Sequence, residues 1–300
     1  MDHRALIASL PPDAKDRLQQ RSDRAGLRHL AGYLALLAVT SSGIALQVPL
    51  WPLLILPQGI LLVFLFTLSH ECTHKTPFKT GRLNDVIGHL VSIPIALPFT
   101  WFRYFHLAHH KWTNHPEKDP ELGGKPRPQD RRSLLIYLSG WPYWSGMTRV
   151  LCQNAFGPID APYLPARQHK AMRVEARLLL AVYLAAALSL IASPLVLWLW
   201  MLPVLIGQPF LRLYLLAEHG LCPTVANMLE NSRTTFTNRI VRFVAWNMPY
   251  HAEHHAFPNV PFHQLPVLHV WTREHLKSTS DSYSEFTGEY VRSVKHQSFR

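Results

Sequence analysis

The stretch HLAGYLALLAVTSSGIALQVPLWPLLILPQGILLVFLFTLSHECTH, residues 29–74, contains Glu71 as its only Lys, Arg, Asp or Glu. The prolines at 49 and 52 divide it into two apolar halves of about 20 residues, and at a rise of about 1.5 Å per residue each half can cross a hydrocarbon core of about 30 Å. We therefore expect membrane-spanning helices over residues 29–48 and 51–70, joined as a hairpin.

A second uncharged block, Leu178 to Leu211, is interrupted around Ala192 to Pro194 and predicts spans over residues 175–193 and 195–216. Buried core helices of a soluble protein are the alternative, but these are commonly about 10–14 residues long rather than two abutting runs of about 20. The sequence thus predicts an all-α integral membrane fold with four transmembrane helices in two hairpins and a helical cytoplasmic cap.

The charged residues indicate how this single domain of residues 1–300 is oriented. The hairpin turns QVPLWP and IASPLV carry no charge, whereas Lys and Arg concentrate in the polar segments, which by the positive-inside rule lie in the cytoplasm. We expect a cytoplasmic arm (1–28), the first hairpin (29–70), a cytoplasmic segment (71–174), the second hairpin (175–216) and a second cytoplasmic segment (217–300). The stretch VIGHLVSIPIALPFTWF, broken by Pro94 and Pro98, suggests an interfacial or re-entrant piece, and the tail after Thr272 a solvated end.

The chain is basic, with a formal net charge of +11. No basic run interleaved with aromatic residues resembles an RNA- or DNA-binding module, so no nucleic-acid partner is expected. An anionic membrane surface explains the charge more simply, and a bacterial inner membrane fits best. Three cysteines far apart, without a CxxC pair, indicate neither a disulfide framework nor a thiolate metal site.

Histidines gather in three patches: HECTH (70–74), HLAHH (106–110) and HAEHH (251–255). Residues three or four positions apart share one face of a helix, which is the spacing that metal ligands need. HECTH also matches the HExxH motif of zinc proteases, but a single tetrahedral zinc leaves most of these histidines unused. A further histidine, His219 in AEHG, stands at the predicted end of the fourth span, where an ionisable group is unfavourable unless it has a function. Imidazole suits several transition metals, so spacing alone does not name the metal.

The segments HECTH, HLAHHKWTNHPEKDPE and NMPYHAEHHAFPNVPFHQLP resemble the three histidine boxes of the membrane fatty acid desaturase superfamily, over about residues 30–270. The pattern is closest to that of bacterial acyl-lipid desaturases. The resemblance implies two iron ions, O2 as co-substrate, a lipid or fatty acyl substrate in the membrane, and an external electron donor such as a ferredoxin or cytochrome. It implies metal ligands at His70, His74, His106, His109, His110, His219, His251, His254 and His255.

Ligating histidines usually donate their second N–H to a carboxylate or carbonyl group. The acidic residues near the boxes are candidates for that role: Glu71, Asp119, Glu121, Glu218 and Glu253. In one branch of the superfamily, the acyl-CoA desaturases, an asparagine stands four residues before the position of His219, and here that place is taken by Leu215.

The expected reaction is O2-dependent oxidation of an unactivated C–H bond in a membrane lipid, with desaturation of a fatty acyl chain favoured. Hydroxylation or ketolation of a fatty chain or carotenoid is the alternative, because the boxes do not distinguish these outcomes. A metal transporter or metal-binding protein is a more distant alternative. Transport needs polar groups within the membrane spans, and the predicted spans are almost purely apolar.

Overall fold

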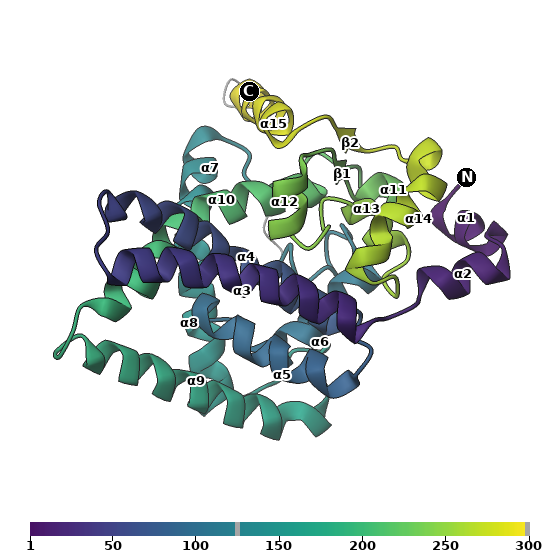
Figure 1. The fold of residues 1–300 in the computed structure, drawn as a ribbon. Coiled ribbons are helices and arrows are strands. Elements are labelled where there is room, and N and C mark those ends of the chain that lie inside the picture. The colour runs from purple at the N-terminus through teal and green to yellow at the C-terminus, as the bar shows by residue number, and fades with distance from the viewer. Residues whose placement is uncertain (124–126, 298–300) are drawn as a thin grey trace.

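A computed structural model gives the fold of residues 1–123 and 127–297, which is dominated by helices (Figure 1). The α-helices are α1 (His3–Ser9), α2 (Pro12–Leu18), α3 (Asp23–Ala45), α4 (Ile55–His74), α5 (Gly81–Ser92), α6 (Phe99–Trp112), α7 (Arg131–Leu138), α8 (Trp141–Phe156), α9 (His169–Ser189), α10 (Leu202–His219), α11 (Met228–Asn231), α12 (Arg239–Val244), α13 (His251–Ala256), α14 (Leu265–Thr272) and α15 (Tyr283–Gln297). Short helical turns are η1 (Trp51–Leu54), η2 (Ile93–Ile95), η3 (Ala166–Gln168), the π-helical η4 (Leu197–Met201), η5 (Phe262–Gln264) and η6 (Arg273–His275). Strands β1 (Thr234–Thr235) and β2 (Thr279–Ser280) pair in parallel.

Two helices are long and apolar enough to cross a membrane: Trp51–His74, of 24 residues, and Leu197–His219, of 23. A third crossing is counted if the bent pair Gly81–Ile95 and Phe99–Trp112 forms one broken span. Helices α3 and α9 have 23 and 21 residues, so they are also long enough, but they are not among the candidate spans. The structure thus shows a helical protein with two or three candidate spans among its described residues.

The two apolar helices α4 and α10 cross in close contact at a pair of glycines. A Cβ atom on Gly59 would lie 2.1 Å from the carbonyl oxygen of Pro203, and one on Gly207 would lie 2.4 Å from the backbone of Gly59. Small residues permit such close approach of helices in membranes. His70 and His219 each follow the crossing by about 11 or 12 residues, or roughly 17 Å of helix. His70 and His219, near the C-terminal ends of the two helices, therefore lie at similar distances from the crossing.

Helices α3 and α9 begin earlier than the sequence pattern predicts. The side chain of Ser22 accepts a hydrogen bond from the backbone N–H of Ala25 at 3.2 Å, so α3 is capped at Ser22 rather than starting at residue 29. Helix α9 likewise starts at His169 instead of residue 175. Both therefore have a charged first part and an apolar second part. Each precedes its apolar partner in the chain, α3 before α4 and α9 before α10.

The proline-broken stretch forms α5, η2 and α6, and α5–η2 meets α6 at an angle of 98°. Pro94 lies in η2 and Pro98 caps α6, where a missing N–H is tolerated. Because α6 turns back in this way, its C-terminal end carries the second histidine patch toward the end of α4. The bend fits a broken span as well as the expected interfacial or re-entrant piece, so that expectation stays a prediction.

The expectation of a solvated tail after Thr272 is wrong for the described residues. Helix α15 packs against α7 and α10 through Phe286 and Tyr290, and Phe286 is fully buried. Strand β2 pairs with β1 just before α15 begins. The tail thus covers the part of the molecule where α10 ends.

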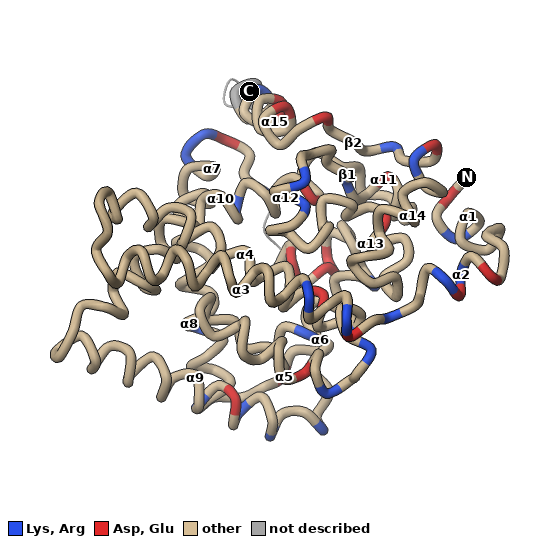
Figure 2. The backbone as a smooth tube through the Cα atoms, viewed as in Figure 1, with Lys and Arg blue, Asp and Glu red and all other residues tan. Residues whose placement is uncertain are grey.

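Charge is distributed unevenly over the fold (Figure 2). The second half of α3, α4 up to His70, the second half of α9 and the first part of α10 carry no Lys, Arg, Asp or Glu, whereas charged residues gather around α1, α2, the start of α3, the first half of α9 and the segments from α11 to α15. The histidine patches lie where the uncharged helices meet the charged segments.

Candidate metal centre

The three histidine patches converge from distant parts of the chain into one cluster, in which only His74 and His110 are partly rather than fully buried. Each patch ends or forms a helix: the first lies at the end of α4, the second at the end of α6 and the third in α13. His219, at the end of α10, joins them with its Nε2 3.0 Å from that of His251. All nine sequence-predicted histidines therefore lie together.

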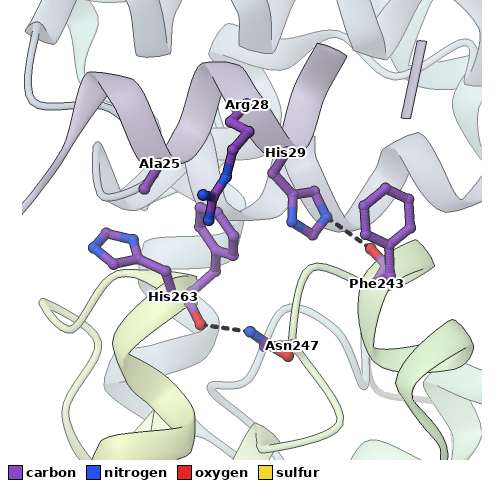
Figure 3. A pocket seen from close by; sticks show the side chains of 7 residues that line it. Ala25, Arg28, His29, Phe243, Asn247 and His263 are labelled. Atoms are coloured by element: carbon purple, nitrogen blue, oxygen red, sulfur yellow. Dashed lines mark hydrogen bonds between the residues drawn. The ribbon is translucent and has the colours of Figure 1, made fainter. Parts of the chain in front are cut away.

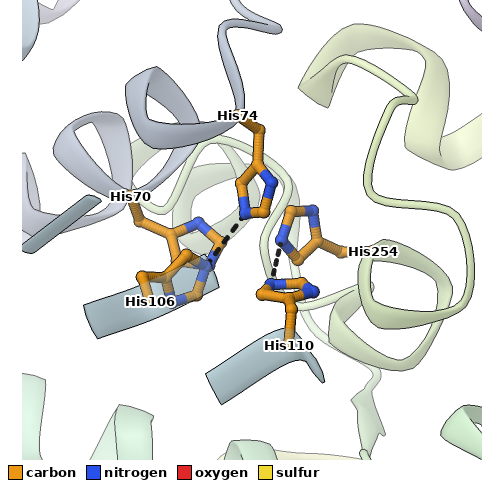
Figure 4. Close-up of side chains that lie close together, drawn as sticks. All are labelled: His70, His74, His106, His110 and His254. Carbon is orange, nitrogen blue, oxygen red and sulfur yellow. Dashed lines mark hydrogen bonds between the residues drawn. The ribbon is translucent and has the colours of Figure 1, made fainter. Parts of the chain in front are cut away.

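Five of these histidines form one group, shown in Figure 4 and called here the five-histidine group: His70, His74, His106, His110 and His254. One ring nitrogen of each lies within 4.8 Å of those of the others. The Nε2 atoms of His74 and His106 are 2.9 Å apart, and those of His110 and His254 are 3.2 Å apart. Both ring nitrogens of the buried His70 lack a hydrogen-bond partner.

The remaining group of three, His109, His219 and His255, is called the three-histidine group. Its ring nitrogens also lie within 4.8 Å of one another, and all three side chains are buried. The Nε2 atoms of His109 and His219 are 3.2 Å apart. His251 lies beside this group through its contact with His219.

Helix geometry explains how one patch serves both groups. At about 100° per residue, positions 106 and 110 differ by roughly 40° around the helix axis, whereas position 109 lies about 60° to the other side of position 106. His106 and His110 accordingly join the five-histidine group and His109 the three-histidine group. In α13, His254 and His255 are divided between the groups in the same way.

Outside the cluster, oxygen atoms hold the Nδ1 atoms of several histidines. His109 donates from Nδ1 to the carboxylate of Asp119 at 2.9 and 3.0 Å. Looser contacts join His109 to Glu121 at 3.6 Å, His251 to Glu218 at 3.4 Å and His254 to Glu71 at 3.5 Å. Four of the five acidic residues selected from the sequence therefore face a histidine of the cluster.

Glu253 is the exception. Although it stands between His251 and His254 in the sequence, its buried carboxylate accepts hydrogen bonds from His269, Thr234 and Thr272. These partners belong to α14 and β1, so Glu253 joins α13 to its neighbours. The reason is geometric, because consecutive residues of a helix point about 100° apart and Glu253 faces away from the direction of its histidine neighbours.

Two further contacts to the three-histidine group were not predicted from the sequence. His219 donates from Nδ1 to the backbone carbonyl oxygen of Asn231 at 3.1 Å. The hydroxyl of Thr113 donates to the carbonyl oxygen of His109 at 2.9 Å, so it accepts from Nδ1 of His255 at 3.2 Å. A search for carboxylates alone misses a backbone carbonyl and a hydroxyl, although Thr113 follows the second patch directly.

The donor atoms of the three-histidine group fit a bound metal ion. With Nδ1 of His109, His219 and His255 acting as donors, the Nε2 atoms of the neutral rings carry lone pairs that point at one another inside the protein. Such lone pairs repel unless a cation lies between them. Burial also lowers the pKa of His251, His254 and His255 well below the usual range, which favours the neutral imidazole that binds metals.

The HExxH interpretation does not fit the position of Glu71. In a zinc protease this glutamate acts as the general base. Here its Oε2 atom accepts hydrogen bonds from the hydroxyl of Thr76 and the backbone N–H of Phe262, each at 3.1 Å. The side chain is fully buried and its other oxygen faces His254. Glu71 therefore serves to hold its neighbours in place.

A cavity of about 360 Å³ lies beside α3, apart from the nine histidines (Figure 3). His29 donates to the carbonyl oxygen of Phe243 at 2.8 Å, and Asn247 donates to that of Phe262 at 3.0 Å, so both polar side chains already hold the cavity walls together. The cavity is linked to the histidine cluster through its lining residue Phe262, whose backbone N–H donates a hydrogen bond to Glu71. Its lining comprises Ala25, Arg28, His29, Phe243, Asn247, Phe262 and His263.

A buried cluster of histidines at the ends of apolar helices is typical of membrane proteins with a metal site of imidazole ligands. Residues 45–287 match the family model described as fatty acid desaturase. The chain belongs to the fatty acid desaturase family, and the resemblance drawn from the histidine boxes is confirmed.

Named relatives of this chain are desaturases of fatty acids and of acyl lipids. It is 24% identical over 279 residues to an omega-3 fatty acid desaturase, chloroplastic, of Glycine max, a match that covers 83% of this chain and 62% of that protein. It is 26% identical over 275 residues to the sn-2 acyl-lipid omega-3 desaturase (ferredoxin), chloroplastic, of Helianthus annuus, with 82% and 62% covered. A shorter match, 30% identical over 102 residues, covers 31% of this chain and 28% of the sn-1 acyl-lipid omega-3 desaturase (ferredoxin) of Nostoc. The chain thus spans about three fifths of the length of the two plant relatives.

Proposed function

We propose that this protein is an acyl-lipid desaturase, which uses O2 to introduce a double bond into a fatty acyl chain of a membrane lipid. The observation that carries the proposal is the arrangement of eight histidines in two adjoining, mostly buried groups at the ends of helices, with His251 beside them. Membership of the desaturase family and the names of the relatives support the same reaction.

The two groups of histidines are proposed to hold two iron ions. One is assigned to His70, His74, His106, His110 and His254, and the other to His109, His219 and His255, with His251 beside it. Bound there, the irons would supply the O2-dependent oxidation that removes hydrogen from an unactivated C–H bond. The overall reaction consumes O2, two electrons, two protons and two hydrogen atoms of the acyl chain, and yields an alkene and two molecules of water.

The protein's own residues prepare this site by orienting imidazoles and excluding water. Asp119, the Asn231 carbonyl and Thr113 each hold an Nδ1 atom, which directs Nε2 of the same ring inward. The carboxylates of Glu71 and Glu218 lie 3.5 and 3.4 Å from Nδ1 of His254 and His251, and they are proposed to orient these two rings less tightly. The burial of the cluster keeps bulk water away from it.

Four membrane crossings are proposed: α3 with α4 and α9 with α10, in two hairpins, with the remaining helices in a cytoplasmic cap. Exposed apolar side chains along α3 and α9, such as Val39 and Leu184 at 69% and 62% exposure, support contact with lipid. The arm (1–28), the hairpins (29–70 and 175–216) and the cytoplasmic segments (71–174 and 217–300) follow from this topology. The gathering of Lys and Arg around the cap supports a site on the cytoplasmic face. The membrane is proposed to be a bacterial inner membrane.

A separate electron donor is proposed, because the reaction consumes two electrons that the acyl chain does not supply. Two of the relatives carry ferredoxin in their names, which supports a ferredoxin here as well. The basic protein would attract an acidic donor through long-range electrostatics. Electron-transfer rates that do not change with ionic strength would contradict that attraction.

The proposal is tested by comparing mass-resolved lipid extracts, including carotenoids, from aerobic cells that express the wild type or the His109→Ala variant. A lipid that loses two hydrogens only with the wild type supports a desaturase and identifies its substrate. A lipid that gains oxygen would instead indicate a hydroxylase or ketolase. Unchanged lipids together with protein-dependent metal uptake would indicate a transporter.

A further inference from the structure

Asn114 occupies an unusual position immediately beyond the second histidine patch. It is 2% exposed, and its backbone has a φ of +59°, a left-handed conformation that asparagine tolerates better than most residues. Its backbone N–H donates to Oδ2 of Asp119 at 2.8 Å. Because the same carboxylate accepts from His109, Asn114 helps to hold the group that orients His109.

The side chain of Asn114 reaches a second histidine through Asn231. Its Nδ2 donates to the carbonyl oxygen of Asn231 at 2.7 Å, and that oxygen also accepts from Nδ1 of His219. A carbonyl oxygen has two lone pairs, so both are occupied in this arrangement. The carbonyl is thereby fixed in the direction that His219 requires.

Arg127 sets the orientation of the Asn114 amide. Its guanidinium donates to Oδ1 of Asn114 at 2.7 Å, and the reversed amide would turn an N–H2 group toward those donors. Nδ2 must therefore face Asn231. Asn114 connects segments that are 117 residues apart in the chain.

We propose that Asn114 is a positioning residue that holds His109 and His219 through Asp119 and Asn231, and so sets the metal affinity of the three-histidine group. The inference rests on the metal centre of the proposed function. Asn114 itself touches neither imidazole directly in the contacts described above. Its effect is confined to one of the two groups, because its bonded partners lead to His109 and His219.

Two variants separate this role from local folding. Asn114→Gly removes the amide but keeps the left-handed backbone and the N–H to Asp119. Asn114→Asp keeps the size and the pairing with Arg127, but its carboxylate oxygen faces the Asn231 carbonyl without a hydrogen to donate. Metal-free protein in detergent is titrated with Fe(II) without oxygen, and bound iron is measured against a competing chelator and by Mössbauer spectroscopy.

The wild type is expected to bind two irons. In Asn114→Gly, the affinity for one of them should fall about 10- to 100-fold, the range typical when the outer partner of a metal ligand is lost. Asn114→Asp should lose at least as much affinity, and the spectrum of one iron alone should change in both variants. A residue that only fills space would leave Asn114→Asp like the wild type.

Asn84 provides a matched control. It is fully buried and holds a loop through hydrogen bonds to Phe78 and Thr80, and none of the hydrogen bonds of its side chain goes to one of the nine histidines. Asn84→Ala should lower thermal stability while both irons bind with wild-type affinity. Wild-type affinity and spectrum in Asn114→Asp, or equal weakening of both irons, would overturn the inference. A wild type that binds no iron would overturn the proposed metal centre and the inference together.

Discussion

The five-histidine group and the three-histidine group are built differently. Four members of the five-histidine group stand in pairs, four residues apart, on the long helices α4 and α6, and both ring nitrogens of His70 lack partners. The three-histidine group takes one residue each from α6, α10 and α13, and every Nδ1 atom in it has an oxygen partner. Where a helix fixes the spacing of ligands, few outer contacts are needed. Where ligands come from separate segments, hydrogen bonds hold them instead.

Removing one histidine from each group should have the largest effect. In His109→Ala or His254→Ala, we expect one iron to be lost and desaturation to be abolished, because an imidazole of the group is missing. Iron per chain, lipid product and insertion into membranes are measured. His169→Ala is the control, since its ring contacts the Leu164 carbonyl oxygen outside both groups. Full activity in His109→Ala or His254→Ala would remove that residue from the ligand set.

Acid should act on both groups together in the metal-free protein. Burial lowers the pKa of His251, His254 and His255, so the folded protein leaves them neutral while the unfolded chain takes up protons below pH of about 6.5. The unfolding free energy should therefore fall as the pH is lowered from about 6.5 toward the folded pKa, by up to about 1.4 kcal/mol per pH unit for each histidine. Denaturant titrations in detergent at several pH values measure the unfolding free energy. An unfolding free energy that does not change with pH would contradict the claim that these histidines are buried in the neutral form.

The outer partners should matter more in the three-histidine group than in the five-histidine group. In Asp119→Asn, the affinity for one iron is expected to fall about 10- to 100-fold, because His109 loses a charged acceptor. Glu71→Gln should have a smaller effect, less than about tenfold, since its 3.5 Å contact to His254 is longer than a hydrogen bond of about 2.7–3.2 Å. Chelator competition measures both variants, and equal losses would remove the distinction between the two groups.

The smallest effect on the metals is expected from Glu253, although it lies between two histidines of the third patch. Glu253→Gln weakens the buried contacts to His269 and Thr272, which should lower the unfolding free energy by about 1–3 kcal/mol. Both irons should remain bound with wild-type affinity. Loss of iron from folded Glu253→Gln protein would show that this carboxylate supports the metal centre after all.

Much of the architecture could be predicted because it depends on local patterns. Apolar runs of about 20 residues indicate helices that can cross a membrane, and histidines three or four residues apart indicate one helix face. These patterns located the apolar helices α4 and α10, the bent α5–α6 piece and all nine clustered histidines. The predicted starts of the helices were less accurate, because Ser22 caps α3 several residues before its apolar part begins.

The sequence by itself determined the class of protein and the set of clustered histidines, through the resemblance of its histidine boxes. It also determined the apolar helices, because hydropathy is a property of neighbouring residues. Only the tertiary structure decided how those histidines divide into two groups and which atoms hold them. The Gly59–Gly207 crossing sets the level of His70 and His219, and the bond from Asn114 to Asn231 joins residues 117 positions apart. Packing between separate helices creates such contacts, so no local pattern in the sequence records them.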